Sequence, residues 1–181
     1  LAYQNDDFGK AGYNAIIEEI DNYDGVEIVE EVNYQAGDVE FSAQAEKIKN
    51  ADPDAIFAFA VTEPAANLKK ALHRIGVRDA AFFASSVGAN DSNLFELAGE
   101  EVWNGTITSA VFPMPDQSDD KVMEIFIEQF SKDYPNDPLA GYAQIGWAGA
   151  QVFVEALERA GNDLTWDNFL QTFYTFDNWQ D

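Results

Sequence analysis

The segment Asp54-Ala-Ile-Phe-Ala-Phe-Ala60 decides the predicted fold. All six residues after the first are apolar, which is typical of a central strand in a parallel sheet that helices cover on both sides. A helix over 63–75 is predicted next. Thr62 can cap its start, Pro64 suits its first turn, and Gly76 can end it. A buried strand followed by such a helix indicates a βαβ unit.

The same alternation of short apolar runs and amphipathic stretches extends over the first part of the chain. In the first amphipathic stretch, apolar side chains recur at helical spacing, and Gly25 follows where a helix stop would lie. The predicted class is therefore α/β, with a parallel sheet. We expect strands near 1–4, 26–33, 54–61, 80–84 and 105–111, and helices near 9–22, 39–50, 63–75 and 91–98.

The pattern changes at Pro113-Met-Pro115-Asp-Gln-Ser118, a segment with two prolines that suits a crossing between domains. Beyond it we expect only helices, near 122–134, near 140–160 and after Thr165. We therefore predict an α/β domain over 1–115 and a helical segment over 116–181. The chain lacks an initiator Met, and its first residues resemble the end of a longer strand, so we expect it to start midway through a longer protein.

Composition narrows the classes of function. A hydrophobic fraction of 46% with 14% aromatic residues is that of a globular protein. The net charge of −23 would repel phosphate backbones and anionic lipids, so no nucleic acid partner is expected. The charge itself is interpreted as solubility or adaptation to salt. No apolar run approaches the ~20 residues that cross a bilayer, so the chain is not predicted to span a membrane.

Motifs for catalysis, cofactors and metals are missing from the sequence. With no cysteine and only His73, thiol catalysis, Cys-ligated zinc and histidine clusters are excluded. Glycine-rich dinucleotide and phosphate loops and the hydrolase elbow are absent, and the many acidic pairs are interpreted as solvated surface. His73 is interpreted as structural, without an orienting partner. Asn5-Asp-Asp7 and Asn90-Asp-Ser-Asn93 lack calcium-loop spacing and suit turns and helix caps. We predict no cofactor and no metal.

The loops after the strands are the remaining candidate for a site, because parallel sheets bind ligands just past the carboxyl ends of their strands. These loops are 4–9, 60–63 and 85–90. Each carries hydroxyl, amide or aromatic groups and leads into a helix N-terminus, whose backbone N–H groups favour a carboxylate. We expect a crevice that suits a small zwitterion. The alternative is that all three are ordinary turns.

A set of short motifs adds a resemblance that covers nearly the whole chain. Each motif is weak alone, but their order along the sequence is similar to that of type I periplasmic binding proteins that serve branched-chain amino acid ABC transporters. The motifs are Asn5-Asp-Asp-Phe-Gly9, Gly37-Asp-Val-Glu-Phe-Ser42, Ala51-Asp-Pro-Asp-Ala-Ile-Phe57, Leu68-Lys-Lys-Ala71 with Ile75-Gly76, Leu97-Ala-Gly99 and Ala140-Gly-Tyr142.

The resemblance implies a two-lobed clamshell. Residues 1–115 would form most of its second lobe, and residues 116–181 would be helices that return to a first lobe outside this sequence. In the family, the first lobe holds the amino and carboxylate groups of the ligand, and the second lobe closes over it by a hinge. The ligand-binding residues that the resemblance and the loops suggest are Phe8, Ala60, Val61, Ser85, Ser86 and Tyr142.

The resemblance also implies a function. It predicts a non-enzymatic receptor that presents a small molecule, an amino acid or a related amide or carboxylate, to an ABC transporter permease. It places the protein in the periplasm or otherwise outside the cytoplasm, with a membrane anchor before Leu1 as one option.

Two departures from the family leave open whether leucine, isoleucine or valine is the ligand. Ser85 stands near the place of an acidic residue that pairs with the ligand's ammonium, and Ala60 or Val61 stands near the place of an aromatic side chain. Glu63 could supply the charge, although a helix N-terminus also explains an acid there. Two other functions stay open: a ligand-sensing domain of an amide- or amino-acid-responsive regulator or receptor, and a flavodoxin-like or hydrolytic α/β enzyme.

Overall fold

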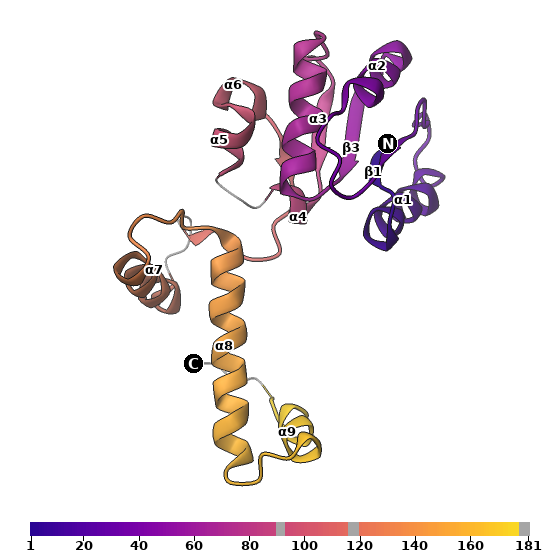
Figure 1. The fold of residues 1–181 in the computed structure, drawn as a ribbon. Helices are drawn as coiled ribbons and strands as arrows, with labels where there is room; N and C mark the ends of the chain where they lie inside the picture. Colours follow the sequence, from indigo (N-terminus) through magenta and orange to yellow (C-terminus); the bar gives the residue numbers. More distant parts are fainter. Residues whose placement is uncertain (90–92, 116–119, 178–181) are drawn as a thin grey trace. The chain divides into compact units, whose positions relative to one another are not determined.

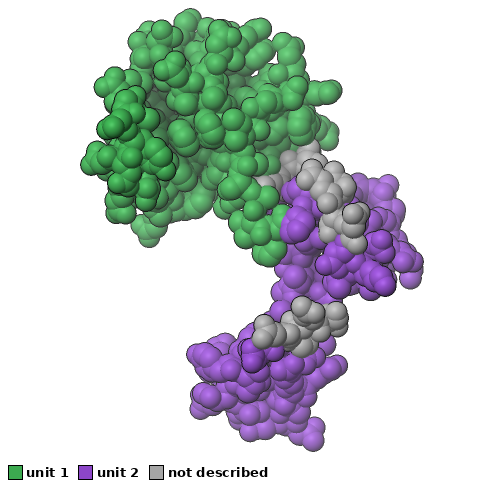
Figure 2. Space-filling view, turned by 180° about the vertical axis from the view of Figure 1, so that it is seen from behind, with its two compact units in different colours: residues 1–112 green, residues 113–181 purple. Residues whose placement is uncertain are grey.

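The computed structural model describes residues 1–89, 93–115 and 120–177 and divides into two compact units, residues 1–112 and 113–181 (Figure 2). The first unit is an α/β unit and the second is helical in its described part. The assignment of residues 1–115 and 116–181 to two lobes of a clamshell stays a prediction.

The first unit is built on a five-stranded sheet in the order β2-β1-β3-β4-β5, and every neighbouring pair is parallel. This confirms the predicted α/β class with a parallel sheet. Figure 1 labels β1 and β3 of this sheet. The strands are β1 (Ala2–Gln4), β2 (Val32–Tyr34), β3 (Ala55–Phe59), β4 (Ala81–Ala84) and β5 (Ile107–Thr108).

One helix follows each of the strands β1, β2 and β3, three short helices follow β4, and three more lie in the described part of the second unit. They are α1 (Asp7–Ile20), α2 (Ser42–Ala51), α3 (Thr62–Arg74), α4 (Ser86–Ala89), α5 (Leu94–Ala98), α6 (Glu100–Trp103), α7 (Lys121–Asp133), α8 (Gly141–Ala160) and α9 (Trp166–Phe173). No helix in the described part of the chain is long and apolar enough to cross a bilayer.

Two predicted strands are longer than those observed. The strand expected at 26–33 is found only at Val32–Tyr34, which pair with Ala2–Gln4 of β1. The strand expected at 105–111 is reduced to Ile107–Thr108, since β4 pairs with it only through Phe83 and Ala84. Strand-like sequence alone did not reveal where the pairing partner ends.

Two predictions for helices also need correction. Thr62 does not cap α3: Val61 holds the cap position without a side-chain hydrogen bond, and Thr62 is the first helical residue. The expected helix at 91–98 begins outside the described residues, and its described part is the short helix Leu94–Ala98. Pro64 lies in the first turn of α3, and Gly76 follows the helix with a φ of +90°, as predicted.

The two faces of β3 are buried to different extents. Ile56 and Ala58 are buried in the core that α2 and α3 complete. Phe57 and Phe59 point to the other face and are only half-buried, although α1 packs there so closely that a Cβ on Gly12 would lie 1.9 Å from the Phe59 ring. Helices therefore cover β3 on both sides, as predicted, although the side chains on the α1 side are only half-buried.

The helices of the second unit pack through aromatic side chains. Trp147 of α8 contacts Phe126 of α7, with ring centroids 5.7 Å apart, and Phe153 of α8 contacts Phe169 of α9, at 5.3 Å. Asp120 caps α7 by accepting a hydrogen bond from the Val122 N–H at 2.8 Å. The described helices agree in position with those predicted beyond residue 121.

Candidate functional site

The strand order places a candidate site between the ends of β1 and β3. From β1 the chain crosses to β2 on one side and then returns to add β3 on the other, so the direction of winding reverses between β1 and β3. In open α/β sheets, ligands bind outside the carboxyl ends of the strands at such a reversal. Because Tyr3 pairs with Phe59, the turns that follow these two strands are neighbours at this edge. We call this edge of the sheet, where the strands end, the carboxyl edge.

The turn after β1 is held by a compact set of hydrogen bonds. Asp6 caps α1, its Oδ1 accepting from the Gly9 N–H at 3.0 Å, and the Gln4 side-chain amide donates to the other carboxylate oxygen. These bonds, led by that of Gly9, hold the pKa of Asp6 below its ordinary value. A Cβ on Gly9 would lie 1.9 Å from the Gln4 carbonyl oxygen, so the turn admits only glycine there. The predicted cap role of the Asn5-Asp-Asp7 segment is confirmed at Asp6.

Tyr34 joins the ends of three strands. It is the last residue of β2, and its hydroxyl donates to the Phe59 carbonyl at 3.4 Å, across the end of β1. Burial, with a smaller contribution from the charge of Asp6, raises the pKa of Tyr34, so the hydroxyl keeps its proton. Sequence reasoning missed Tyr34, because it forms part of no catalytic or ligand-binding motif, whereas Gln4, which is buried, is the first residue of the predicted loop 4–9.

The turns after β3 and β4 are joined through Ser85. Its hydroxyl donates to the Ala60 carbonyl at 2.8 Å and accepts from the Gly88 N–H at 3.3 Å. Gly88 packs so closely that a Cβ there would lie 2.3 Å from the Ala60 oxygen. The two turns are therefore in direct contact at the carboxyl edge.

The structure places five of the six predicted ligand-binding residues at this one edge. Phe8, Ser85 and Ser86 are half-buried, Ala60 is 1% exposed, and Val61 is 36% exposed. Tyr142 is 44% exposed and lies at the start of α8, in the second unit. Residue 90, the end of the third predicted loop, lies outside the described residues. A ligand-binding role for all six stays a prediction.

The loops of the carboxyl edge carry negative charge, from Asp6, Asp7 and Glu63. The loops 4–9, 60–63 and 85–90 contain no Lys or Arg, and exposed Asp7 and Glu63 lie in the first turns of α1 and α3. An anionic group bound here would therefore rely on backbone N–H and hydroxyl donors rather than on a cation. In the described residues no three His, Asp or Glu side chains gather as metal ligands. His73 Nε2 lies 3.6 Å from the exposed carboxylate of Glu101, which is longer than a hydrogen bond.

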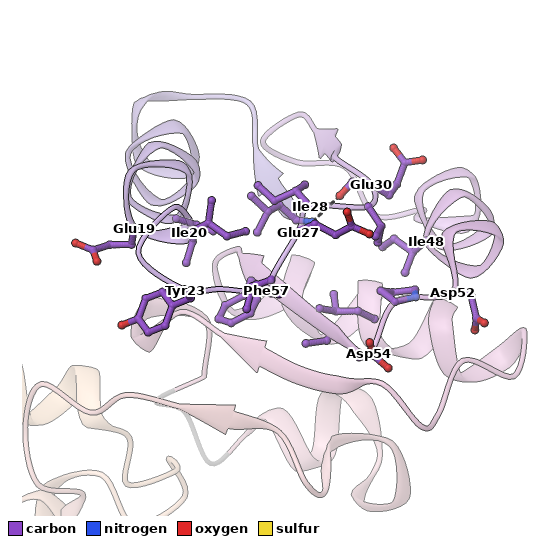
Figure 3. Close-up of a pocket in the computed structure, with 18 residues that line it drawn as sticks. Glu19, Ile20, Tyr23, Glu27, Ile28, Glu30, Ile48, Asp52, Asp54 and Phe57 are labelled. Atoms are coloured by element: carbon purple, nitrogen blue, oxygen red, sulfur yellow. Dashed lines mark hydrogen bonds between the residues drawn. The ribbon is translucent and has the colours of Figure 1, made fainter.

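A cavity of about 590 Å³ lies at the opposite edge of the sheet, near the start of β1 and β3 (Figure 3). Apolar side chains of α1, α2 and β3 line it, including Ile20, Ile48 and Phe57, and Glu19 and Asp52 point outward from it. None of the six predicted ligand-binding residues lines this cavity. The strand order and the three turns favour the carboxyl edge as the ligand site over this cavity.

A family model described as "Periplasmic binding protein" matches residues 1–181. No curated protein matches the chain.

Several solved structures share the fold. The chain is 24% identical to a substrate-binding periplasmic protein from Ralstonia solanacearum, with a TM-score of 0.88 over 99% of this chain and 50% of that one. It is 24% identical to a fatty acid ABC transporter substrate-binding protein from Thermomonospora curvata, with a TM-score of 0.86 over 99% of this chain and 46% of that one. It is 23% identical to a leucine binding protein from Thermotoga maritima, with a TM-score of 0.77 over 95% of this chain and 48% of that one. The chain spans about half the length of these proteins.

Proposed function

We propose a function from one premise: the chain belongs to the periplasmic binding protein family. Proteins of this family bind solutes and are not enzymes, and the family implies a location outside the cytoplasm. We infer that the protein carrying this chain captures a small solute and delivers it to the permease of an ABC transporter. Residues 1–115 would supply one wall of the site, and closure of that wall over the solute would create the surface that docks on the permease.

The observation that carries this proposal is the construction of the carboxyl edge. Three neighbouring turns are fixed to one another or to their own strands by hydrogen bonds of Asp6, Tyr34 and Ser85. A wall that closes over a solute binds best when its shape is preorganised, because less conformational freedom is then lost on binding. Rigid turns at the winding reversal of the sheet meet this requirement.

An amino acid with an apolar side chain is the solute that we propose. The carboxyl edge presents the half-buried ring of Phe8 and the partly exposed side chains of Val61 and Val87, which suit an apolar group. The backbone donors of the turns suit a carboxylate. The names of two similar structures, a leucine binding protein and a fatty acid transporter protein, supply the two solutes to compare.

A thermal-shift screen of the complete protein that carries this sequence tests the proposal. The panel contains leucine, isoleucine, valine, phenylalanine, short amides, urea, aromatic acids and octanoate. A solute at 100 times its Kd should add about 2.7 kcal/mol of stability, which raises the unfolding midpoint measurably. A rise with an aliphatic amino acid supports the proposal. A rise with octanoate alone would replace the amino acid by a fatty acid, and no rise with any solute would contradict the proposed ligand class.

A further inference from the structure

The two adjacent serines at the end of β4 differ in what their hydroxyl groups do. Ser85 Oγ donates its single proton to the Ala60 carbonyl and accepts from the Gly88 N–H. A hydroxyl has one proton and two lone pairs, so Ser85 has no donor left for a solute. Among the described residues, the hydroxyl groups of Ser86 and of Thr62 in the neighbouring turn have no hydrogen-bond partner.

The bonds of Ser85 connect turns that no strand hydrogen bond connects. The backbone N–H of Ser85 donates to the Ala58 carbonyl, and this is the last backbone hydrogen bond between the β3 and β4 segments. Beyond it, the hydroxyl of Ser85 bonds to the Ala60 carbonyl, and Gly88 packs closely on the same carbonyl. Ala60 is 1% exposed, so water cannot easily satisfy its carbonyl if Ser85 is removed.

We propose that Ser85 is a positioning residue: its hydroxyl locks the turn after β3 to the turn after β4, and the solute is contacted instead by the free hydroxyl groups of Thr62 and Ser86. The second part of this inference, that Thr62 and Ser86 contact the solute, rests on the proposed function. It changes the role of Ser85 from a ligand contact to a residue that acts through Ala60 and Gly88.

Amide hydrogen exchange of the solute-free complete protein tests the lock itself. Ser85→Ala leaves the buried Ala60 carbonyl without its donor, which we expect to favour local opening about tenfold and to speed exchange at residues 60–62 and 86–88 by that factor. Ser85→Thr, which keeps a hydroxyl, should restore slow exchange. Ser131→Ala, on the exposed surface of α7, is the matched control and should leave these amides unchanged. Unchanged exchange in Ser85→Ala would overturn the lock.

Binding measurements separate positioning from contact. The probes are leucine, leucinamide and octanoate, titrated calorimetrically into the complete protein. Loss of a positioning residue lowers the population of the competent site, so Ser85→Ala should weaken every probe that binds by the same factor, up to about tenfold. Ser86→Ala should instead weaken the probes unequally, because a direct contact is lost only for the probe group that it binds.

Each remaining outcome has a defined meaning. Unequal weakening in Ser85→Ala, confined to probes with a carboxylate, would make Ser85 a direct contact and overturn the proposal. If Ser85→Ala fails to fold, Gly88→Ala serves as the second variant: its Cβ would force the turns apart at the Ala60 oxygen, and it should also weaken all probes equally. If no probe binds the unaltered protein, the proposed function fails for these solutes, and the exchange experiment still decides whether Ser85 is a lock.

Discussion

Replacing Gly9 by Ala should damage the carboxyl edge and the stability of the first unit together. The added Cβ would lie 1.9 Å from the carbonyl oxygen of Gln4 and 2.6 Å from its nitrogen, and ordinary contacts begin at 3.4 Å. Both obstacles are backbone atoms, so the start of α1 must move away from β1 by more than an ångström. That movement breaks the cap bond from the Gly9 N–H to Asp6, which is 3.0 Å long.

The cost follows from these two effects. Overpacking against backbone costs about 1–3 kcal/mol, and loss of a helix cap costs about 1 kcal/mol. We therefore expect the free energy of unfolding to fall by about 2–4 kcal/mol, which lowers the midpoint of thermal unfolding by about 5–15 °C. Urea unfolding of the complete protein, followed by circular dichroism, measures the change.

Gly37→Ala is the matched control for this experiment. Gly37 has a φ of +92° and open space where a Cβ would lie, so alanine there suffers backbone strain without a clash. Its expected cost is about 1–2 kcal/mol. A loss in Gly9→Ala no larger than that in Gly37→Ala would refute the reasoning that the first turn of α1 is packed against the Gln4 backbone.

Other parts of the first unit give further expectations. Burial lowers the pKa of Lys69 to about 8, so between pH 8 and the ordinary pKa of 10.5 the unfolded chain binds more protons than the folded one, and stability should rise with pH. Urea unfolding should show a gain of about 1–2 kcal/mol across this pH range relative to Lys69→Met, a figure discounted because half of the side chain is exposed. Leu72→Ala removes a side chain that is 2% exposed and should cost about 2–5 kcal/mol in the same assay. Arg74→Ala breaks an exposed contact with Glu40 at 3.4 Å and a hydrogen bond to the Ser42 hydroxyl at 2.6 Å. Because solvent screens exposed ion pairs, stability should fall by less than about 1 kcal/mol, and a larger loss would contradict this expectation.

Local chemistry explains which parts of the fold the sequence could predict. The apolar run at β3, Pro64 in the first turn of α3 and Gly76 after it act within a few residues, and they are found where expected. Strand pairing depends on residues distant in sequence, so residues 26–31, which contain Val26, Ile28 and Val29, are predicted as strand although only Val32–Tyr34 pair with β1. Strand order is likewise a long-range property. The reversal of winding between β1 and β3 is visible only in the structure, because the sequence pattern does not predict the order of the strands.

The candidate site divides in the same way. Parallel pairing predicts that the loops after the strands lie at one edge of the sheet, and the turns at Phe8, Val61 and Ser86 do lie there. Which side chains are free cannot be read from residue types, because Ser85 and Ser86 are chemically identical in sequence. The hydrogen bonds of the Ser85 hydroxyl with Ala60 and Gly88 distinguish them. The contact between Tyr34 and Phe59 connects residues 25 apart and had no local signal.

A calorimetric titration with two aromatic substitutions tests the central claim, that the solute binds at the carboxyl edge, most directly. Phe8→Ala removes a half-buried ring at that edge, and Tyr23→Ala removes a ring that lines the cavity at the opposite edge and is 62% exposed. With the solute that stabilises the complete protein most, we predict that Phe8→Ala weakens binding about tenfold or more and that Tyr23→Ala changes it less than about twofold. The reverse pattern, with binding lost in Tyr23→Ala and kept in Phe8→Ala, would contradict the account.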